Sequence, residues 1–73
     1  MNWNIKGILE LIRAGHTIIC IDDGNTIRVG ELFYNDDDYI SVRLNKGGAL
    51  NIYDDEIYDY EEIDNEILSI QIV

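Results

Sequence analysis

Apolar residues near the start of the chain recur at the spacing of a helix. Four of them between Ile5 and Ile12 occupy positions i, i+3, i+4 and i+7, which places them on one stripe of a helix. Asn4 is suited to cap the N-terminus of this helix, and Gly15 is suited to end it in a left-handed conformation. The pattern therefore predicts a helix over about residues 4–14.

Beyond residue 16 the period of the pattern changes to two, which is typical of short strands. Turn residues separate the alternating segments, and Asn45 to Gly48 form the clearest hairpin turn. Gly30 interrupts one segment and predicts a bulge or a sharp bend there. Residues 54–66 have mixed periodicity, compatible with a loop, a short helical turn or a strand. The predicted strands span about residues 17–22, 26–34, 39–44, 49–53 and 67–73.

These elements fit a single domain over residues 1–73, because a chain of 73 residues is below the size at which domains divide. The expected fold class is α+β, with an N-terminal helix followed by about five short antiparallel strands. We expect these strands to form a small bent sheet or a barrel, because closing the edges on one another hides the exposed edge strands.

The segment between residues 18 and 44 resembles the first motif of the Sm-like family. Gly24, Gly30 and Asp36 lie at about the positions where that family has two turn glycines and a loop aspartate. The resemblance implies an Sm-like barrel that assembles into homo-oligomers. The family's RNA-contacting asparagine would fall on Ile40, and a second RNA-binding motif is absent from the sequence, so RNA binding is not implied.

The charge of the chain is strongly negative and unevenly placed. There are 15 Asp plus Glu against 5 Lys plus Arg, a formal charge of −10, although a hydrophobic content of 47% is typical of a folded chain. Residues 54–73 contain eight acidic and no basic residues, whereas basic residues outnumber acidic ones in residues 1–20. This balance argues against direct binding of nucleic acid or of an anionic membrane, because both need a basic face.

Several protein classes are excluded by composition and by apolar run length. One cysteine excludes a disulfide scaffold and a cysteine-based zinc site. No apolar run approaches the roughly 20 residues of a membrane span, and no signal-peptide pattern opens the chain. We therefore expect a protein of the cytoplasm.

The residues offer no constellation typical of catalysis. Cys20 is expected to be a small buried residue of a strand, and His16 a solvated residue that caps the preceding helix. The carboxylates at residues 36–38 and 54–56 would suit hard cations, but they lack the spacing of a calcium loop. We predict that the protein is not an enzyme and has no cofactor and no dedicated metal site.

Acidic and aromatic residues concentrate in two segments, where they form the predicted partner-binding face. Tyrosine is favoured at interfaces, and dense carboxylates imitate the charge of a phosphate backbone. The alternative is that these acidic residues only keep the chain in solution. The predicted partner-binding residues are Tyr34, Asp36, Asp37, Asp38, Tyr39, Tyr53, Asp54, Asp55, Glu56, Tyr58, Asp59, Tyr60, Glu61, Glu62, Asp64 and Glu66.

A short, proline-free, acidic chain that opens Met-Asn-Trp-Asn-Ile-Lys resembles small proteins that bacteriophages encode as inhibitors of host defence. These include anti-CRISPR proteins and other nucleic-acid mimics. The residues that carry the resemblance are Asp36–Asp38 and Asp54–Glu66. It implies a protein that occupies the basic surface of a nucleic-acid-handling enzyme in the bacterial cytoplasm. The alternative function is a homo-oligomeric Sm-like structural module without catalytic activity.

Overall fold

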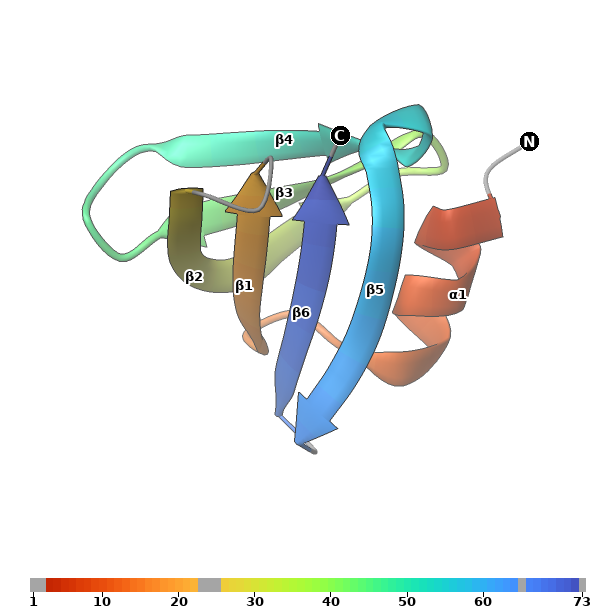
Figure 1. Ribbon diagram of the computed structural model, residues 1–73, viewed down its shortest axis with the longest axis horizontal. Helices are drawn as coiled ribbons and strands as arrows, with labels where there is room; N and C mark the ends of the chain where they lie inside the picture. Colours follow the sequence, from red (N-terminus) through yellow and green to blue (C-terminus); the bar gives the residue numbers. More distant parts are fainter. Residues whose placement is uncertain (1–2, 23–25, 65, 73) are drawn as a thin grey trace.

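The computed structural model describes residues 3–22, 26–64 and 66–72, which form one short helix and six strands (Figure 1). Along the chain these are α1 (Trp3–Leu11), β1 (Thr17–Asp22), β2 (Thr26–Asn35), β3 (Tyr39–Leu44), β4 (Ala49–Tyr53), the 3₁₀ turn η1 (Asp54–Glu56), β5 (Ile57–Asp64) and β6 (Ile67–Ile72). The domain is therefore largely all-β, with α1 packed beside β5 and η1. No helix in the described ranges is long and apolar enough to cross a membrane.

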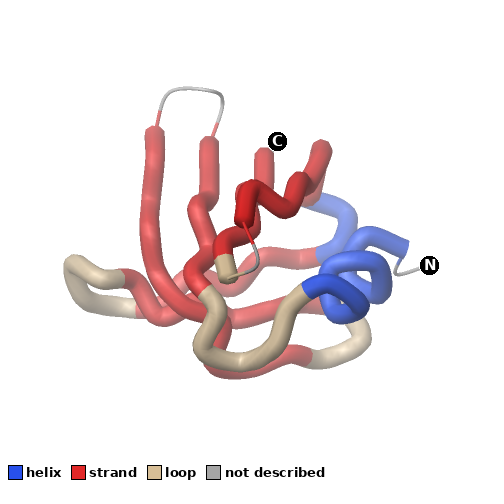
Figure 2. The backbone as a smooth tube through the Cα atoms, turned by 90° about the horizontal axis from the view of Figure 1, so that it is seen from below, coloured by secondary structure: helices blue, strands red, loops and turns tan. Residues whose placement is uncertain are grey.

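The strands form one mixed sheet in the order β4-β3-β2-β1-β6-β5. Neighbouring strands are antiparallel except β1 and β6, which run parallel and pair Thr17 with Ile67 and Asp22 with Ile72. The sheet is strongly curved, as the tube in Figure 2 shows. In the described part of the chain, β4 and β5 are the two ends of the sheet and are not neighbours in it.

The predicted fold class, α+β with about five antiparallel strands in a bent sheet or an Sm-like barrel, is wrong. Residues 57–64 form a further strand, β5, and the chain then returns so that β6 lies parallel to β1. The register between β5 and β6 shifts between Ile57 and Asp59 and again between Glu62 and Asp64. Each extra residue interrupts the period of two, which is why alternation in the sequence does not reveal this strand.

The ranges predicted for the strands at 39–44 and 49–53 coincide with β3 and β4. The helix ends at Leu11, earlier than expected, and Gly15 does not terminate it. Instead Gly15 has a positive φ of 93° and its N–H donates to the Leu32 carbonyl oxygen at 2.7 Å. Gly15 therefore turns the chain into β1, a conformation that glycine adopts readily.

The core lies between α1 and the inner face of the curved sheet. Its buried residues are Ile5, Ile8, Ile12, Ile18, Cys20, Leu32, Ile40, Val42, Ile52, Ile57, Leu68 and Ile70. Two glycines allow close approach within this packing. A Cβ on Gly7 would overlap the Tyr60 hydroxyl, and a Cβ on Gly30 would overlap the Arg43 carbonyl oxygen and lie 2.7 Å from Val42 Cγ1.

Gly30 marks the point where β2 changes partner. Residues 26–31 of β2 pair with β1, and the pairing with β3 begins at Gly30 opposite Leu44. Figure 1 shows that β2 is strongly curled, and its register with β3 shifts farther along than Gly30, between Leu32 and Tyr34. The other glycine of the Sm-like resemblance, Gly24, lies outside the described residues.

Candidate functional site

Two acidic segments that are distant in sequence meet at one end of the sheet. The Asp54 N–H donates to the Asp38 carbonyl oxygen at 3.0 Å, which joins η1 to the turn between β2 and β3. Within that turn the Asp38 N–H donates to Asp36 Oδ1 at 3.2 Å, and the Asp36 N–H donates to the Tyr39 carbonyl oxygen at 2.8 Å. The tertiary structure therefore combines both turns into one surface.

Three tyrosines from neighbouring strands form a row beside these turns. The Tyr39 ring centroid lies 5.7 Å from that of Tyr34 and 5.2 Å from that of Tyr53, with interplanar angles of 44° and 33°. Such tilted pairs at this distance attract each other beyond simple burial. Tyr34 and Tyr53 are 46% and 45% exposed, whereas Tyr39 between them is half-buried.

The position of Tyr39 changes its acidity. Loss of hydration raises the pKa of the Tyr39 hydroxyl, and the neighbouring Tyr34 and the Asp36 carboxylate raise it further. The hydroxyl therefore stays neutral and can donate a hydrogen bond. We call the combined region the acidic–aromatic surface; it consists of Tyr34, Asp36, Asp37, Asp38, Tyr39, Tyr53, Asp54, Asp55 and Glu56.

Asp54 also holds the helix in place. The Ile5 N–H donates to Asp54 Oδ1 at 2.8 Å, so a carboxylate from a distant segment satisfies a free N–H at the start of α1. Asn4 lies inside α1, and its Nδ2 donates to the carbonyl oxygens of Asp54 and Ile57 at 3.4 and 3.1 Å. The capping role expected of Asn4 is thus taken by Asp54.

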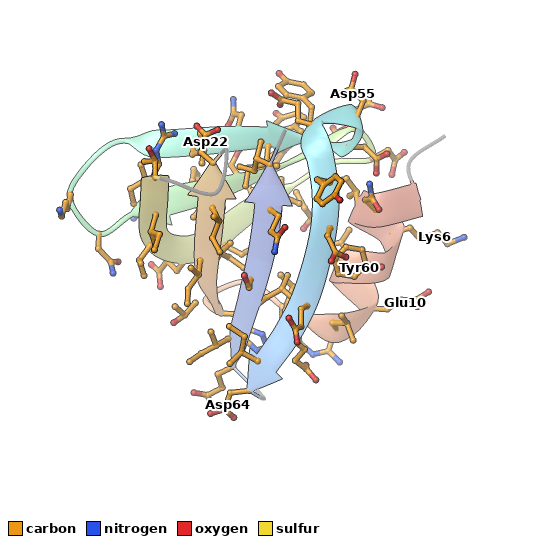
Figure 3. The ribbon with its side chains drawn as sticks, viewed as in Figure 1. Lys6, Glu10, Asp22, Asp55, Tyr60 and Asp64 are labelled. Carbon is orange, nitrogen blue, oxygen red and sulfur yellow. The ribbon has the colours of Figure 1, made fainter. Side chains whose placement is uncertain are left out.

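The neighbouring carboxylates differ in how far the fold uses them. The Tyr53 N–H donates to Glu56 Oε1 at 3.0 Å, which steadies η1. Asp37 and Asp55 are exposed, and within the described ranges no hydrogen bond or ion pair holds their carboxylates. Asp55 projects outward at the end of β5 that adjoins η1 (Figure 3). These two exposed carboxylates of the acidic–aromatic surface are therefore not held by interactions within the described fold.

The other predicted partner-binding residues follow β5 away from this surface. They are Tyr58, Asp59, Tyr60, Glu61, Glu62, Asp64 and, after the strand, Glu66. Asp55 and Asp64 lie at opposite ends of β5 (Figure 3), and a strand of this length spans about 25 Å. Tyr60 is half-buried against Gly7 of α1 and belongs to the packing of the helix. The predicted face is therefore divided between two regions.

The structure adds two polar residues that the sequence prediction missed. Ser41 Oγ donates to Asn51 Oδ1 at 2.6 Å, and this pair lies next to the Tyr39–Tyr53 pair on β3 and β4. Residues two apart on a strand share a face, so the pair lies beside the row of tyrosines, with Ser41 buried and Asn51 exposed. The alternation of β3 could have indicated Ser41, but only the register of β4 identifies Asn51.

The residues considered for catalysis or metal binding lie elsewhere. Burial raises the pKa of the Cys20 thiol to about 11, although Arg28 lowers it slightly, so the thiol stays protonated in the core. His16 Nδ1 accepts the Arg13 N–H at 3.4 Å in the loop after α1. Among the described residues, no group of three His, Cys, Asp or Glu side chains is arranged to hold a metal ion.

Comparisons of the chain with models of protein families, with curated proteins and with solved structures find no match. The function therefore has to be argued from the chemistry of the acidic–aromatic surface. Carboxylate oxygens accept hydrogen bonds, and tyrosine rings attract cations and offer contact area. Such a surface is complementary to Lys and Arg side chains.

Proposed function

We propose that this protein is a non-enzymatic binding protein that occupies the basic, nucleic-acid-binding surface of a partner enzyme. The observation that carries the proposal is the meeting of the turn at Asp36–Asp38 with η1 beside a row of three tyrosines in contact. The formal charge of −10 supports a basic partner and argues against direct contact with nucleic acid or an anionic membrane.

Carboxylates at this density resemble the charge that a nucleic-acid channel is built to receive. Duplex DNA carries one negative charge per about 1.7 Å of its axis. Six of the nine residues of the acidic–aromatic surface are Asp or Glu. Asp36, Asp54 and Glu56 each use an oxygen within the fold, but a carboxylate has about four acceptor positions and keeps some for a partner.

The tyrosines supply binding affinity that exposed charges alone do not. Exposed carboxylates attract a basic partner and accelerate encounter, but they contribute little affinity in water. Tyr34 and Tyr53 add exposed aromatic area on which Arg side chains stack, and Tyr39 fixes their spacing. The resemblance of the sequence to small acidic phage inhibitors of host defence agrees with this proposal and implies a partner in the bacterial cytoplasm.

Affinity capture from a bacterial lysate tests the proposal. The immobilised protein should retain a nucleic-acid-binding enzyme that both rising salt and added duplex DNA displace. The double variant Asp37→Lys/Asp55→Lys should lose this capture, because it reverses the charge of two exposed carboxylates that the fold does not use. The matched control, Glu61→Lys/Glu62→Lys on β5, makes the same change in net charge away from the acidic–aromatic surface and should retain the enzyme.

Three outcomes would contradict the proposal. Equal loss of capture in both double variants would mean that overall charge, and not this surface, binds the enzyme. Recovery of the protein alone at every salt concentration would mean that it associates with itself and not with a partner enzyme. A captured enzyme that duplex DNA does not displace would use a surface other than its nucleic-acid-binding one.

A further inference from the structure

A groove of about 470 Å³ opens at the end of β2 opposite the row of tyrosines. Its lining residues are Ile27, Arg28 and Val29 from β2 and Leu44, Asn45 and Lys46 from the end of β3 and the turn that follows. Successive side chains of a strand point to opposite faces of a sheet. Because three consecutive residues of β2 line the groove, it follows the edge of the strand and not one face of the sheet.

The backbone of β2 is open along this groove. Val29 accepts the Asn45 N–H at 2.9 Å, so the polar backbone groups of Val29 point away from β1. Those of Ile27 point the same way, because backbone direction repeats every two residues in a strand. The pairing with β3 begins only at Gly30, and among the described residues no strand pairs with Ile27 on that side. The N–H and C=O of Ile27 therefore face the groove.

The side chains around this open edge are apolar and cationic. Ile27 is 66% exposed and Val29 36% exposed, which is high for aliphatic residues within a sheet. Lys46 is exposed at the rim, and Arg28 pairs with Asp22 only at 3.6 Å, with both side chains more than a third exposed. Such an exposed pair is weak and leaves Arg28 able to take another anion.

We infer that this groove is a docking site for an extended peptide segment in which aliphatic side chains alternate with carboxylates. The peptide adds a short strand to the open edge of β2 and exchanges backbone hydrogen bonds with Ile27. On one face its aliphatic side chains contact Ile27 and Val29, and on the other face its carboxylates contact Arg28 and Lys46. This site lies at the other end of β2 from the acidic–aromatic surface, so each proposal can fail without the other.

Titration of the ¹⁵N-labelled protein with the peptide Ac-Glu-Ile-Glu-Val-Glu-NH₂ tests the inference. The amide signals of Ile27, Val29 and Asn45 should shift, those of Tyr34 and Tyr53 should not, and hydrogen exchange at the Ile27 N–H should slow. The same peptide with Lys in place of Glu should shift the signals of Ile27, Val29 and Asn45 less, because its charges oppose the cationic rim of the groove.

Two variants separate the electrostatic and the apolar contributions to peptide binding. Lys46→Glu should weaken binding about fivefold, whereas Lys6→Glu, the same change on α1, should leave the affinity unchanged. Ile27→Thr keeps a β-branched residue at an exposed position and should weaken binding about tenfold through lost apolar contact.

The inference is wrong if the shifts caused by the Glu peptide map elsewhere or if none appear at millimolar peptide. It is wrong as well if the Lys peptide shifts the groove signals equally. It is also wrong if the groove signals shift with protein concentration alone, since a second copy would then be the occupant.

Discussion

The two ends of β2 carry surfaces of opposite chemistry. Near Tyr34 the strand leads into the acidic–aromatic surface, whereas near Ile27 it borders a groove with aliphatic walls and the cations Arg28 and Lys46. Acidic residues from the middle and the last part of the chain meet at the first end, while Asp64 lies far from both turns (Figure 3). Position in the sequence therefore does not decide which charges act together.

The two ends are also held by different interactions. At the acidic end, the carboxylates of Asp36, Asp54 and Glu56 accept backbone N–H groups, so side-chain hydrogen bonds order the turns. At the groove end, close backbone approach at Gly30 and the positive φ values of 107° and 81° at Gly47 and Gly48 shape the hairpin. Substitutions should therefore affect the two ends by different mechanisms.

The largest effect on stability is expected at Gly30, where β2 passes from one end to the other. In Gly30→Ala the new Cβ overlaps the Arg43 backbone, which cannot move away as a side chain could. The free energy of unfolding in urea should fall by about 3 kcal/mol. In the control Gly7→Ala the Cβ meets only the far end of the Tyr60 side chain, and the change should be below about 1 kcal/mol. Equal losses would contradict the assignment of Gly30 as the tighter contact.

Cys20 should make stability depend on alkaline pH. Its pKa is raised from 9.0 to about 11 in the folded state, so the unfolded thiol ionises first and stability falls as the pH rises from 9 to 11. The loss attributable to Cys20 should be about 2 to 3 kcal/mol over that range. Urea unfolding of the wild type and of Cys20→Ala as a function of pH measures it. Parallel pH profiles for the two proteins would show that the thiol is not desolvated.

Asp54 and Asp55 are adjacent, but their substitution by alanine should change the free energy of unfolding by different amounts. Asp54→Ala removes the acceptor of the Ile5 N–H and should lower the free energy of unfolding by about 1 to 2 kcal/mol. Asp55→Ala should change it by less than about 0.5 kcal/mol, because the side chain is exposed. Urea denaturation of both variants checks this, and a similar loss in the two would contradict the assignment of the stabilising contact to the hydrogen bond between Asp54 and Ile5.

The smallest expected effect concerns Tyr39, at the acidic end. Its raised pKa means that the neutral hydroxyl is favoured in the fold, so stability is full below the ordinary value of 10.0 and falls as the pH rises above it. Ultraviolet titration should show a late component that ionises above the ordinary pKa value of 10.0. Tyr39→Phe should remove this late component, whereas Tyr58→Phe, which alters the 74% exposed ring of β5, should not. If Tyr58→Phe removed the late component, the assignment of that component to Tyr39 would be wrong.

Local periodicity was sufficient for much of the sheet. The period of two around Ile40 and Val42 predicted the range of β3 and these two buried apolar side chains, because alternate residues of a strand face the core. It did not predict that Ser41 between them is buried as well. The helical spacing from Ile5 to Ile12 likewise identified the buried side of the N-terminal segment. The concentration of acid in the last part of the chain was also evident from the sequence.

Tertiary structure alone decided how these parts combine. Because β5 contains two bulges, its sequence lacks the regular alternation of a strand. The parallel pairing of β6 with β1 depends on where the chain returns to the sheet. The contact between Asp54 and α1, the meeting of the two acidic turns and the open edge at Ile27 all join residues that no local pattern relates. Periodicity reports which face of an element is buried, whereas a binding surface depends on which elements become neighbours, and long-range pairing determines that.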